Sequence, residues 1–446
     1  MFSTQSLFDD IVCDGPILVA VSGGSDSVAL LLLAHSWSLK SKAHLQAVTV
    51  DHGLRPEAAA EAAFVASLCA GLGVPHVTLA WEGIKPSFGI QEAARQSRYS
   101  LMDDFAHEIG ADIILTGHTR DDQAETIMMR ALRSVEASDG RGLSSMGRKT
   151  WLYGGTKLMR PLLNHSRRQL RGYLSQMAQP WIEDPSNLDR SYERVRIRDL
   201  LREDKQLEDR LHRLGNLSGR FRKQLALSVA QELENKVVAR PGPVFEASGF
   251  SAENPISTQA IQVLIAMAGG QLYLVSKKRL GAVIDLANGS AQSTKVARAN
   301  IGGAIVERKG DKLLFYRETR NLSSLLLDPD EAAIWDGRMH IYNGTALPVF
   351  IEAASRQQLL EFEAAREEPY PVMPRAALRS TPIVHIQTQN GETMPCLPLV
   401  ESSKLPKGLE IRLASPAIEH FCPDFDAALR DWVRSLDQYP AASLQP

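Results

Sequence analysis

The first motif that could do chemistry is a hydroxyl-rich loop between two apolar runs. It consists of Ser22, Gly23, Gly24, Ser25, Asp26 and Ser27. Glycines let a backbone turn tightly and bring its amide groups close to a ligand. A helix after the loop would add N–H donors and the positive end of its dipole, and the serines would add hydroxyls. The motif therefore predicts an anion site that cradles phosphates.

Asp26 is the unexpected member of this loop, because a carboxylate repels a bare phosphate. It fits the pattern if it holds a magnesium ion that is itself bound to the phosphates. No Gly-Lys-Ser/Thr ending follows, so the loop is not a Walker A motif. The alternative is a plain strand-to-helix turn in which a serine caps the helix.

A second group of chemical side chains lies in "DDQAET", which contains Asp121, Asp122 and Glu125. On a helix, Asp122 and Glu125 are three residues apart and share a face. His118 precedes the group at the end of an apolar run. The alternative for Asp121 is a structural role in the first turn, where a negative charge favours the helix dipole.

Two further pairs of residues are candidates for nucleotide contacts. Asp51 and His52 end an apolar run, at the sheet edge that often contacts a ribose or base. The alternative for these two is a simple turn before Gly53. Arg95 and Arg98 lie three apart on one helix face, which suits contact with RNA phosphates or with a carboxylate partner. A solvated basic face is equally consistent with them.

A basic helical segment follows between residues 160 and 223. Its closely spaced Arg194, Arg196 and Arg198 could contact a nucleic-acid backbone, which positions the polymer without reading its sequence. The alternative is again a charged face in water.

These motifs are spaced by alternating strand-like and helix-like runs. Short β-rich runs begin near Ile17, Leu45, His76 and Ile113. Longer helical runs follow them, at Ser25–Leu39, Arg55–Gly73, Gly89–Gly110 and Arg120–Ser134. This rhythm predicts an α/β fold with a doubly wound, mostly parallel sheet. Ligands bind such sheets at the carboxyl ends of the strands, where the polar motifs lie.

The remaining sequence differs from this alternating pattern and predicts further regions beyond the catalytic domain. We expect a catalytic domain over 1–200, a helical basic extension over 201–240 and a smaller α+β region over 241–446. The proline and glycine content of Ala239–Phe250 predicts a linker. A hairpin turn is expected at Lys309-Gly310-Asp311.

Bulk composition is that of a soluble globular protein: 446 residues, 44% apolar and 23% charged, with a net charge of −2. A local basic face could still bind nucleic acid. The four cysteines form no C-x-x-C pair, which disfavours a disulfide framework, a zinc ribbon or an iron–sulfur site. Neither a signal peptide nor a membrane span is expected. We therefore predict a cytoplasmic protein, a monomer or homodimer, without a membrane partner.

Together the motifs resemble a known family. "SGGSDS" resembles the SGGxDS motif of the PP-loop ATPases, which have an adenine nucleotide alpha hydrolase-like fold. The series is similar to that of tRNA(Ile)-lysidine synthetases and covers about the first half of the chain. Its other members are "VDHGLR" (Val50–Arg55), "QEAARQSRY" (Gln91–Tyr99), "TGHTRDDQAET" (Thr116–Thr126), "RPLL" (Arg160–Leu163) and "WIEDPSNLDRSYERVRIR" (Trp181–Arg198).

The resemblance implies a reaction. ATP and Mg²⁺ would activate the C2 oxygen of the first anticodon cytidine of an isoleucine tRNA with a CAU anticodon. The amine of L-lysine would then displace AMP and form lysidine. Asp26 and Asp122 would hold the metal, Glu125 the lysine ammonium, and His118 would contact ATP or lysine. The C-terminal region would help to hold the tRNA.

One loop departs from the family pattern. The glycine-rich stretch after "DDQAET" is here "LRSVEASDGRGLSSMG" (Leu132–Gly147), with Ser134–Asp139 in place of the first glycines. We expect this loop to shape the access of cytidine or lysine. The alternatives in function are a PP-loop thiolase, whose cysteines are not arranged here, and a non-catalytic RNA-binding protein. An amidotransferase is disfavoured because no N-terminal cysteine nucleophile or glutaminase half is present.

Overall fold

The computed structural model describes most of the chain. The described residues are 4–54, 57–83, 85–133, 141–183, 189–251, 253–289, 297–364, 374–387, 393–398 and 405–436. The chain divides into two compact units. The first comprises Met1–Gln224 and Phe421–Phe425, and the second Leu225–His420 and Asp426–Pro446.

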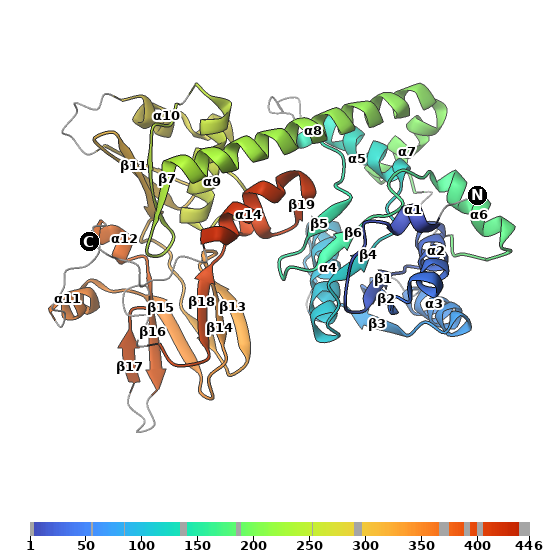
Figure 1. The fold of residues 1–446 in the computed structure, drawn as a ribbon, viewed down its shortest axis with the longest axis horizontal. Helices are drawn as coiled ribbons and strands as arrows, with labels where there is room; N and C mark the ends of the chain where they lie inside the picture. The colour runs from blue at the N-terminus through green and yellow to red at the C-terminus, as the bar shows by residue number, and fades with distance from the viewer. Residues whose placement is uncertain are drawn as a thin grey trace. The chain divides into compact units, whose positions relative to one another are not determined.

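A seven-stranded sheet forms the centre of the first unit (Figure 1). Its order is β19-β5-β6-β4-β1-β2-β3, and the five strands from β6 to β3 are parallel. The bounds are β1 Ile17–Ala20, β2 Leu45–Asp51, β3 His76–Ala80, β4 Ile113–Leu115, β5 Lys149–Trp151, β6 Lys157–Met159 and β19 Cys422–Pro423. The predicted doubly wound, mostly parallel α/β fold is confirmed.

Helices cover both faces of this sheet because its strands are apolar on both sides. Ile17 and Val19 face a core shared with α1, α2, α3 and α6, while Leu18 faces α4. The helices are α1 Thr4–Phe8, α2 Ser25–Ser41, α3 Ala58–Leu72, α4 Ile90–Glu108, α5 Arg120–Arg133, α6 Arg167–Gln176 and α7 Glu193–Glu203. This alternation aligns the carboxyl ends of β1, β2 and β4 at one edge.

The predicted linker at Ala239–Phe250 is wrong. Most of it belongs to an antiparallel hairpin of β7 (Val237–Arg240) and β8 (Val244–Ser248). Gly242 has a φ of 78°, a left-handed conformation that glycine adopts without steric cost. The proline and glycine content of this segment therefore indicates a tight turn between two strands. The basic extension before it is one continuous helix, α8 (Lys205–Lys236), and the boundary between the two units falls within it.

The second unit contains three antiparallel sheets and short helices. One sheet has the order β7-β8-β11-β10-β9, with β9 Ala297–Ile301, β10 Ala304–Lys309 and β11 Lys312–Arg317. The expected hairpin turn lies between β10 and β11. The other two sheets contain β12 Leu325–Leu327, β13 Glu331–Trp335, β14 Met339–Asn343, β15 Val349–Ala353, β16 Pro382–Gln387, β17 Thr393–Cys396 and β18 Leu409–Leu413. This mixture fits an α+β region.

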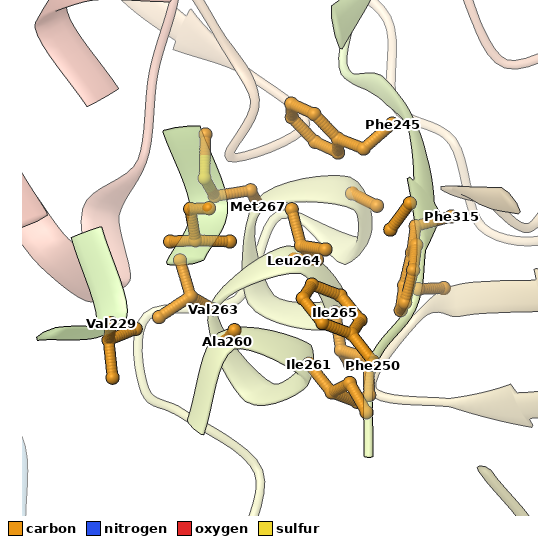
Figure 2. Packing of buried hydrophobic residues seen from close by; sticks show 14 of the residues in the cluster. Val229, Phe245, Phe250, Ala260, Ile261, Val263, Leu264, Ile265, Met267 and Phe315 are labelled. Carbon is orange, nitrogen blue, oxygen red and sulfur yellow. The ribbon is translucent and has the colours of Figure 1, made fainter. Parts of the chain in front are cut away.

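The largest core of the second unit surrounds α9 (Pro255–Gly269), which is buried along almost its whole length. Figure 2 shows Ile261 and Leu264 of this helix packed among Phe245, Phe250 and Phe315. The remaining helices are α10 Gly281–Asn288, α11 Arg356–Ala364, α12 Arg375–Leu378, α13 Pro416–Glu419 and α14 Ala427–Leu436. Within the described residues, no helix combines the length and apolar character that crossing a bilayer requires.

Candidate active site

The hydroxyl-rich loop lies between β1 and α2, as the sequence predicts, and its own side chains brace it. The Ser22 amide donates to Ser27 Oγ over 3.1 Å, and Ser27 Oγ donates to the Gly24 carbonyl over 3.0 Å. Ser25 begins α2, so the first amides of that helix face the same space. The loop is therefore shaped for an anion before any ligand arrives.

Two glycines allow other segments to approach the loop closely. A Cβ on Gly23, whose φ is 86°, would lie 2.8 Å from Ile182 Cδ1. A Cβ on Gly117, in the loop after β4, would lie 2.9 Å from the carbonyl oxygen of Asp26. The phosphate loop and the loop that precedes α5 are thus in backbone contact.

This contact brings the carboxylates of α5 towards Asp26. Asp122 is fixed by its neighbour, because the Thr119 amide and hydroxyl donate to its Oδ2 over 2.8 and 2.7 Å. Its Oδ1 is left to face the site. Glu125 lies on the same face of the helix and is 1% exposed. The two residues share arginine partners, as their spacing of three residues predicts.

Three arginines neutralise these carboxylates. Arg167, the first residue of α6, contacts Asp26 over 3.0 Å, Glu125 over 2.6 Å and also Asp122. From α7, Arg194 binds Asp122 over 2.7 Å and Glu125 over 2.6 Å, and Arg198 binds Glu125 over 3.0 Å. Three negative and three positive side chains thus form one network.

Burial and these arginines set the ionisation of the network. Burial raises the pKa of Asp26 from 3.8 to about 6, although Arg167 opposes the rise. Burial also disfavours ionised Asp122 and Glu125, but Arg167 and Arg194 outweigh it and hold both pKa values below their usual range. Asp26 is therefore the carboxylate whose negative charge is least compensated.

A cavity of about 880 Å³ lies in front of the loop. One part of its lining is apolar and includes Val48, Val50 and Met102, which suits a planar heterocycle. The other lining residues include Ser22, Ser25, Asp26 and Asp122 together with six arginines. The cavity thus offers both apolar contacts and groups that bind phosphate.

A second cavity of about 380 Å³ lies beside the network. Asp121, Glu125 and Glu208 line it together with arginines and Lys205. Because it carries both charges, it suits a zwitterion with a carboxylate and an ammonium group. The Asp121 carboxylate accepts the backbone amide of Arg167 over 2.9 Å, so it also ties α5 to α6.

His118 lines the larger cavity, and its Nδ1 lies 3.0 Å from Thr116 Oγ1. Burial lowers the pKa of His118, and the nearby Arg160 guanidinium lowers it further. A neutral imidazole therefore faces the site at physiological pH.

The sheet edge places the other predicted nucleotide residues beside the cavity. The Asp51 carboxylate accepts the Gly53 amide over 2.7 Å and so closes a turn. His52 Nε2 lies 3.0 Å from Arg98 Nη2. Among the described lining residues are Val50 and Arg98 but not Asp51 or His52.

The arginines predicted to contact RNA fall into two groups. Arg194 and Arg198 pair with site carboxylates, as described above. Arg95 stacks on Tyr99, with 5.0 Å between the guanidinium carbon and the ring centroid, and is exposed. Exposed Arg196 donates to the carbonyls of Arg190 and Ser191 over 2.8 Å.

Asp26 and Asp122 fit a magnesium site. Both converge on the Arg167 guanidinium, so the fold already accommodates a cation between them. Mg²⁺ takes one or two carboxylates and completes its octahedron with water and phosphate oxygens. Within the part of the chain that is described, no three His, Cys, Asp or Glu side chains are grouped to hold a metal. ATP and water would have to supply the remaining ligands.

Sequence reasoning missed the role of Arg167. Arg167 lies with Arg168 and Arg171 in the basic segment between residues 160 and 223, and the charge of that segment favours an RNA contact. The signal that could have placed it is the capping box of Ser166 and Gln169, which puts Arg167 in the first turn of a helix soon after the buried pair Leu162 and Leu163. The departing segment Ser134–Asp139 lies outside the described residues, as does Arg55 of "VDHGLR".

Comparisons with known proteins show which family the chain belongs to. Residues 3–204 match the family model described as "PP-loop domain". The tRNA(Ile)-lysidine synthase of Brucella suis biovar 1 (strain 1330) is 33% identical over 428 residues, which cover 94% of each chain. The synthase of Brucella canis (strain ATCC 23365 / NCTC 10854 / RM-666) matches with the same identity and coverage.

Solved structures match less of the chain. The U34-tRNA thiolase NcsA from Methanococcus maripaludis has a TM-score of 0.42 at 14% identity, covering 49% of this chain and 77% of its own. The NMN synthetase from Francisella tularensis has a TM-score of 0.29 at 15% identity, covering 50% of this chain and 96% of its own.

Proposed function

Because the chain belongs to the tRNA(Ile)-lysidine synthase family, we propose that it joins L-lysine to an isoleucine tRNA with a CAU anticodon. ATP first adenylates the C2 oxygen of the first anticodon cytidine, and pyrophosphate leaves. The lysine amine then attacks C2, and AMP leaves with that oxygen. The observation that carries this proposal is that the Ser/Gly loop, with its Asp26, and Asp122 of α5 line one and the same cavity.

The cavity supports a defined orientation of ATP. The adenine would lie against the apolar residues Val48, Val50 and Met102. The β- and γ-phosphates would lie in the loop, where the hydroxyls of Ser22 and Ser25 and the start of α2 face them. This leaves the α-phosphate towards the network, where the cytidine oxygen must attack it. Positioning and charge stabilisation would then supply most of the catalysis.

Asp26 and Asp122 would hold Mg²⁺ together with phosphate oxygens. The ion supplies neutralisation of the charge that develops as pyrophosphate leaves. Arg167 would give up its contact with Asp26 at that stage and remain bound to Glu125. The same guanidinium is then next to the phosphates, where a fixed planar donor favours a transferring phosphoryl group.

Lysine is assigned to the smaller cavity. Glu125 would contact its ammonium group, and the arginines that line the cavity would contact its carboxylate. Arg194 and Arg198 therefore act within the site in this proposal. Contacts with the RNA backbone are proposed for the exposed Arg95, Arg98 and Arg196. Phosphate contacts of this kind orient an RNA, and the cytidine itself must be unstacked to enter.

The alternative thiolase chemistry requires cysteines beside the nucleotide. Cys69 is buried in the core of the first unit, and no cysteine is found among the described residues that line either cavity. A non-catalytic RNA-binding protein would gain nothing from a buried network of three carboxylates, which is costly to keep.

The test is a digest of isoleucine tRNA with a CAU anticodon, analysed by nucleoside mass spectrometry after incubation with the protein, Mg-ATP and L-lysine. We expect a cytidine mass increased by lysine minus water, in an ATP-dependent manner. Omission of lysine should still release pyrophosphate once per tRNA. A sulfur-for-oxygen increment with an added sulfur donor, or tRNA binding without any modification, would contradict the proposal.

A further inference from the structure

The short segment Phe421–Phe425 belongs to the first unit, although its neighbours on both sides belong to the second. Cys422 and Pro423 form β19, which pairs antiparallel with β5 at Trp151 and Thr150. The catalytic sheet therefore takes its outermost strand from a part of the chain about 270 residues later. A strand that only covered a sheet edge would need no further contact with the site.

Phe421 makes such contacts. Its ring centroid lies 4.9 Å from that of Tyr99, with 56° between the ring planes. The Arg95 guanidinium carbon is 5.6 Å from the Phe421 centroid and 5.0 Å from that of Tyr99. The Arg160 guanidinium carbon is 5.8 Å from the same Phe421 ring. One ring from the end of the chain thus contacts three side chains of the catalytic unit.

The Arg160 side chain is 1% exposed, so its positive charge must be stabilised by protein groups such as the Phe421 ring, because water cannot reach it. Its Nη1 donates to the Gly147 carbonyl over 2.7 Å and to Thr150 Oγ1 over 2.8 Å. Its Nε has no hydrogen-bond partner, and within the described residues no carboxylate forms an ion pair with it. An aromatic face attracts such a desolvated guanidinium more strongly than an exposed one.

Two of these three partners, Tyr99 and Arg160, connect Phe421 with the nucleotide cavity. Tyr99 lines the cavity next to Arg98 and Met102 of the same helix. Arg160 does not line it, but its charge helps to keep His118, which does, in the neutral form. Displacement of the Phe421 ring would therefore free Tyr99, which forms part of the cavity lining, to move. It would also leave the Arg160 guanidinium less firmly placed.

We propose that Phe421 is a positioning residue of the nucleotide site, and that the segment Phe421–Phe425 completes this site from behind. The inference rests on the proposed function, since it concerns the cavity assigned to ATP. It assigns to the C-terminal part of the chain a share in ATP handling besides any contact with RNA. The lysine cavity has no lining residue in contact with Phe421 among those described, so lysine handling should not depend on it.

The test compares three substitutions in the full-length protein. Phe421→Leu keeps an apolar side chain but removes the ring, and Phe421→Tyr keeps the ring. Phe362→Leu, at a half-buried phenylalanine of the second unit, is the matched control. For each protein, ATP binding without RNA is measured, followed by KM for ATP, KM for lysine and kcat.

We expect Phe421→Leu to weaken ATP binding and to raise KM for ATP about three- to tenfold, the size of a lost aromatic pair. KM for lysine should stay within about twofold of the original. Phe421→Tyr and Phe362→Leu should both bind ATP as the original protein does. Unchanged ATP binding in Phe421→Leu, or equal damage in Phe421→Tyr, would overturn the inference.

Folding and function are separated by two further results. The φ of Phe421 is 65°, so Phe421→Gly removes the ring and also relieves backbone strain. This variant should therefore fold even if Phe421→Leu does not, and it should show the same selective loss of ATP binding. Failure of the unsubstituted protein to bind ATP would instead overturn the proposed function.

Discussion

Replacing Asp26 by asparagine should stabilise the protein while abolishing its activity. The Asp26 side chain is 21% exposed. Its carboxylate accepts hydrogen bonds from Arg167 Nε over 3.0 Å and from Ser25 Oγ over 3.2 Å. Burial is nevertheless the dominant influence, and it raises the pKa of this carboxyl from 3.8 to about 6. The folded protein therefore disfavours the ionised form that Mg²⁺ requires.

The magnitude follows from proton linkage. Between pH 3.8 and about 6 the folded protein retains a proton that the unfolded chain has released, so the free energy of unfolding falls as pH rises. Above pH 6 the full penalty applies, and it amounts to about 3 kcal/mol because a tenfold change in proton affinity is worth about 1.4 kcal/mol. Asparagine never ionises. Asp26→Asn should thus be more stable by up to about 3 kcal/mol at pH 8, and the difference should shrink towards zero near pH 4.

The assay is urea unfolding at several pH values between 4 and 8, without nucleotide or Mg²⁺. Asp209→Asn serves as the control, because Asp209 is an exposed partner of Arg120 and its loss should change stability by less than about 1 kcal/mol. In parallel, Asp26→Asn should lower lysidine formation by about 100-fold or more, since a metal ligand is lost. An Asp26→Asn protein that is less stable than the original at pH 8 would refute this reasoning.

Three further predictions concern the same site. Arg167→Met should lower the free energy of unfolding by about 3 kcal/mol or more at pH 8, because three carboxylates lose a shared cation. Arg167→Lys should recover part of this loss. A change below about 1 kcal/mol for Arg167→Met in urea unfolding would contradict the prediction. Gly117→Ala places a Cβ 2.9 Å from the Asp26 carbonyl oxygen and 3.0 Å from the Ser27 amide nitrogen, so we expect a lower Tm and at least about tenfold weaker ATP binding by calorimetry, whereas unchanged ATP affinity would count against the close approach. The value of kcat/KM for ATP should rise with pH through about pH 6 as Asp26 ionises. The rise should persist in His118→Gln, because the pKa of His118 lies lower. A profile that is flat from pH 5 to 8 would be inconsistent with this assignment.

The fold of the catalytic unit was predictable because its rules are local. Strands β1 to β4 are short, largely apolar runs, and a helix with a polar boundary follows each of them, whereas β6 (Lys157–Met159) is too short to be predicted in this way. Asp26 and Asp122 come close together because each lies in the first turn of a helix that follows a parallel strand, and the carboxyl ends of those strands meet at one edge. Their assignment to a metal remains a prediction.

The parts that could not be predicted depend on distant partners. From the sequence, Arg167 and Arg194 are expected on a basic surface. Their partner Glu125 lies about 40 and 70 residues earlier in the chain, and nothing near either arginine indicates this contact. β19 is two residues long and contains a proline, so neither alternation nor length marks it as a strand. The hairpin at Gly242 was misjudged because proline and glycine occur both in linkers and in tight turns.

The late origin of β19 has a consequence for the synthesis of the protein. β5 is complete at Trp151, but the strand that covers its edge appears only at Cys422. At about 5 to 20 residues per second, a ribosome needs roughly 14 to 54 seconds for the chain between them. During that time the growing sheet has an open edge, which is a template for pairing with other chains. We therefore expect the nascent protein to need protection of this edge until Cys422 and Pro423 have been made.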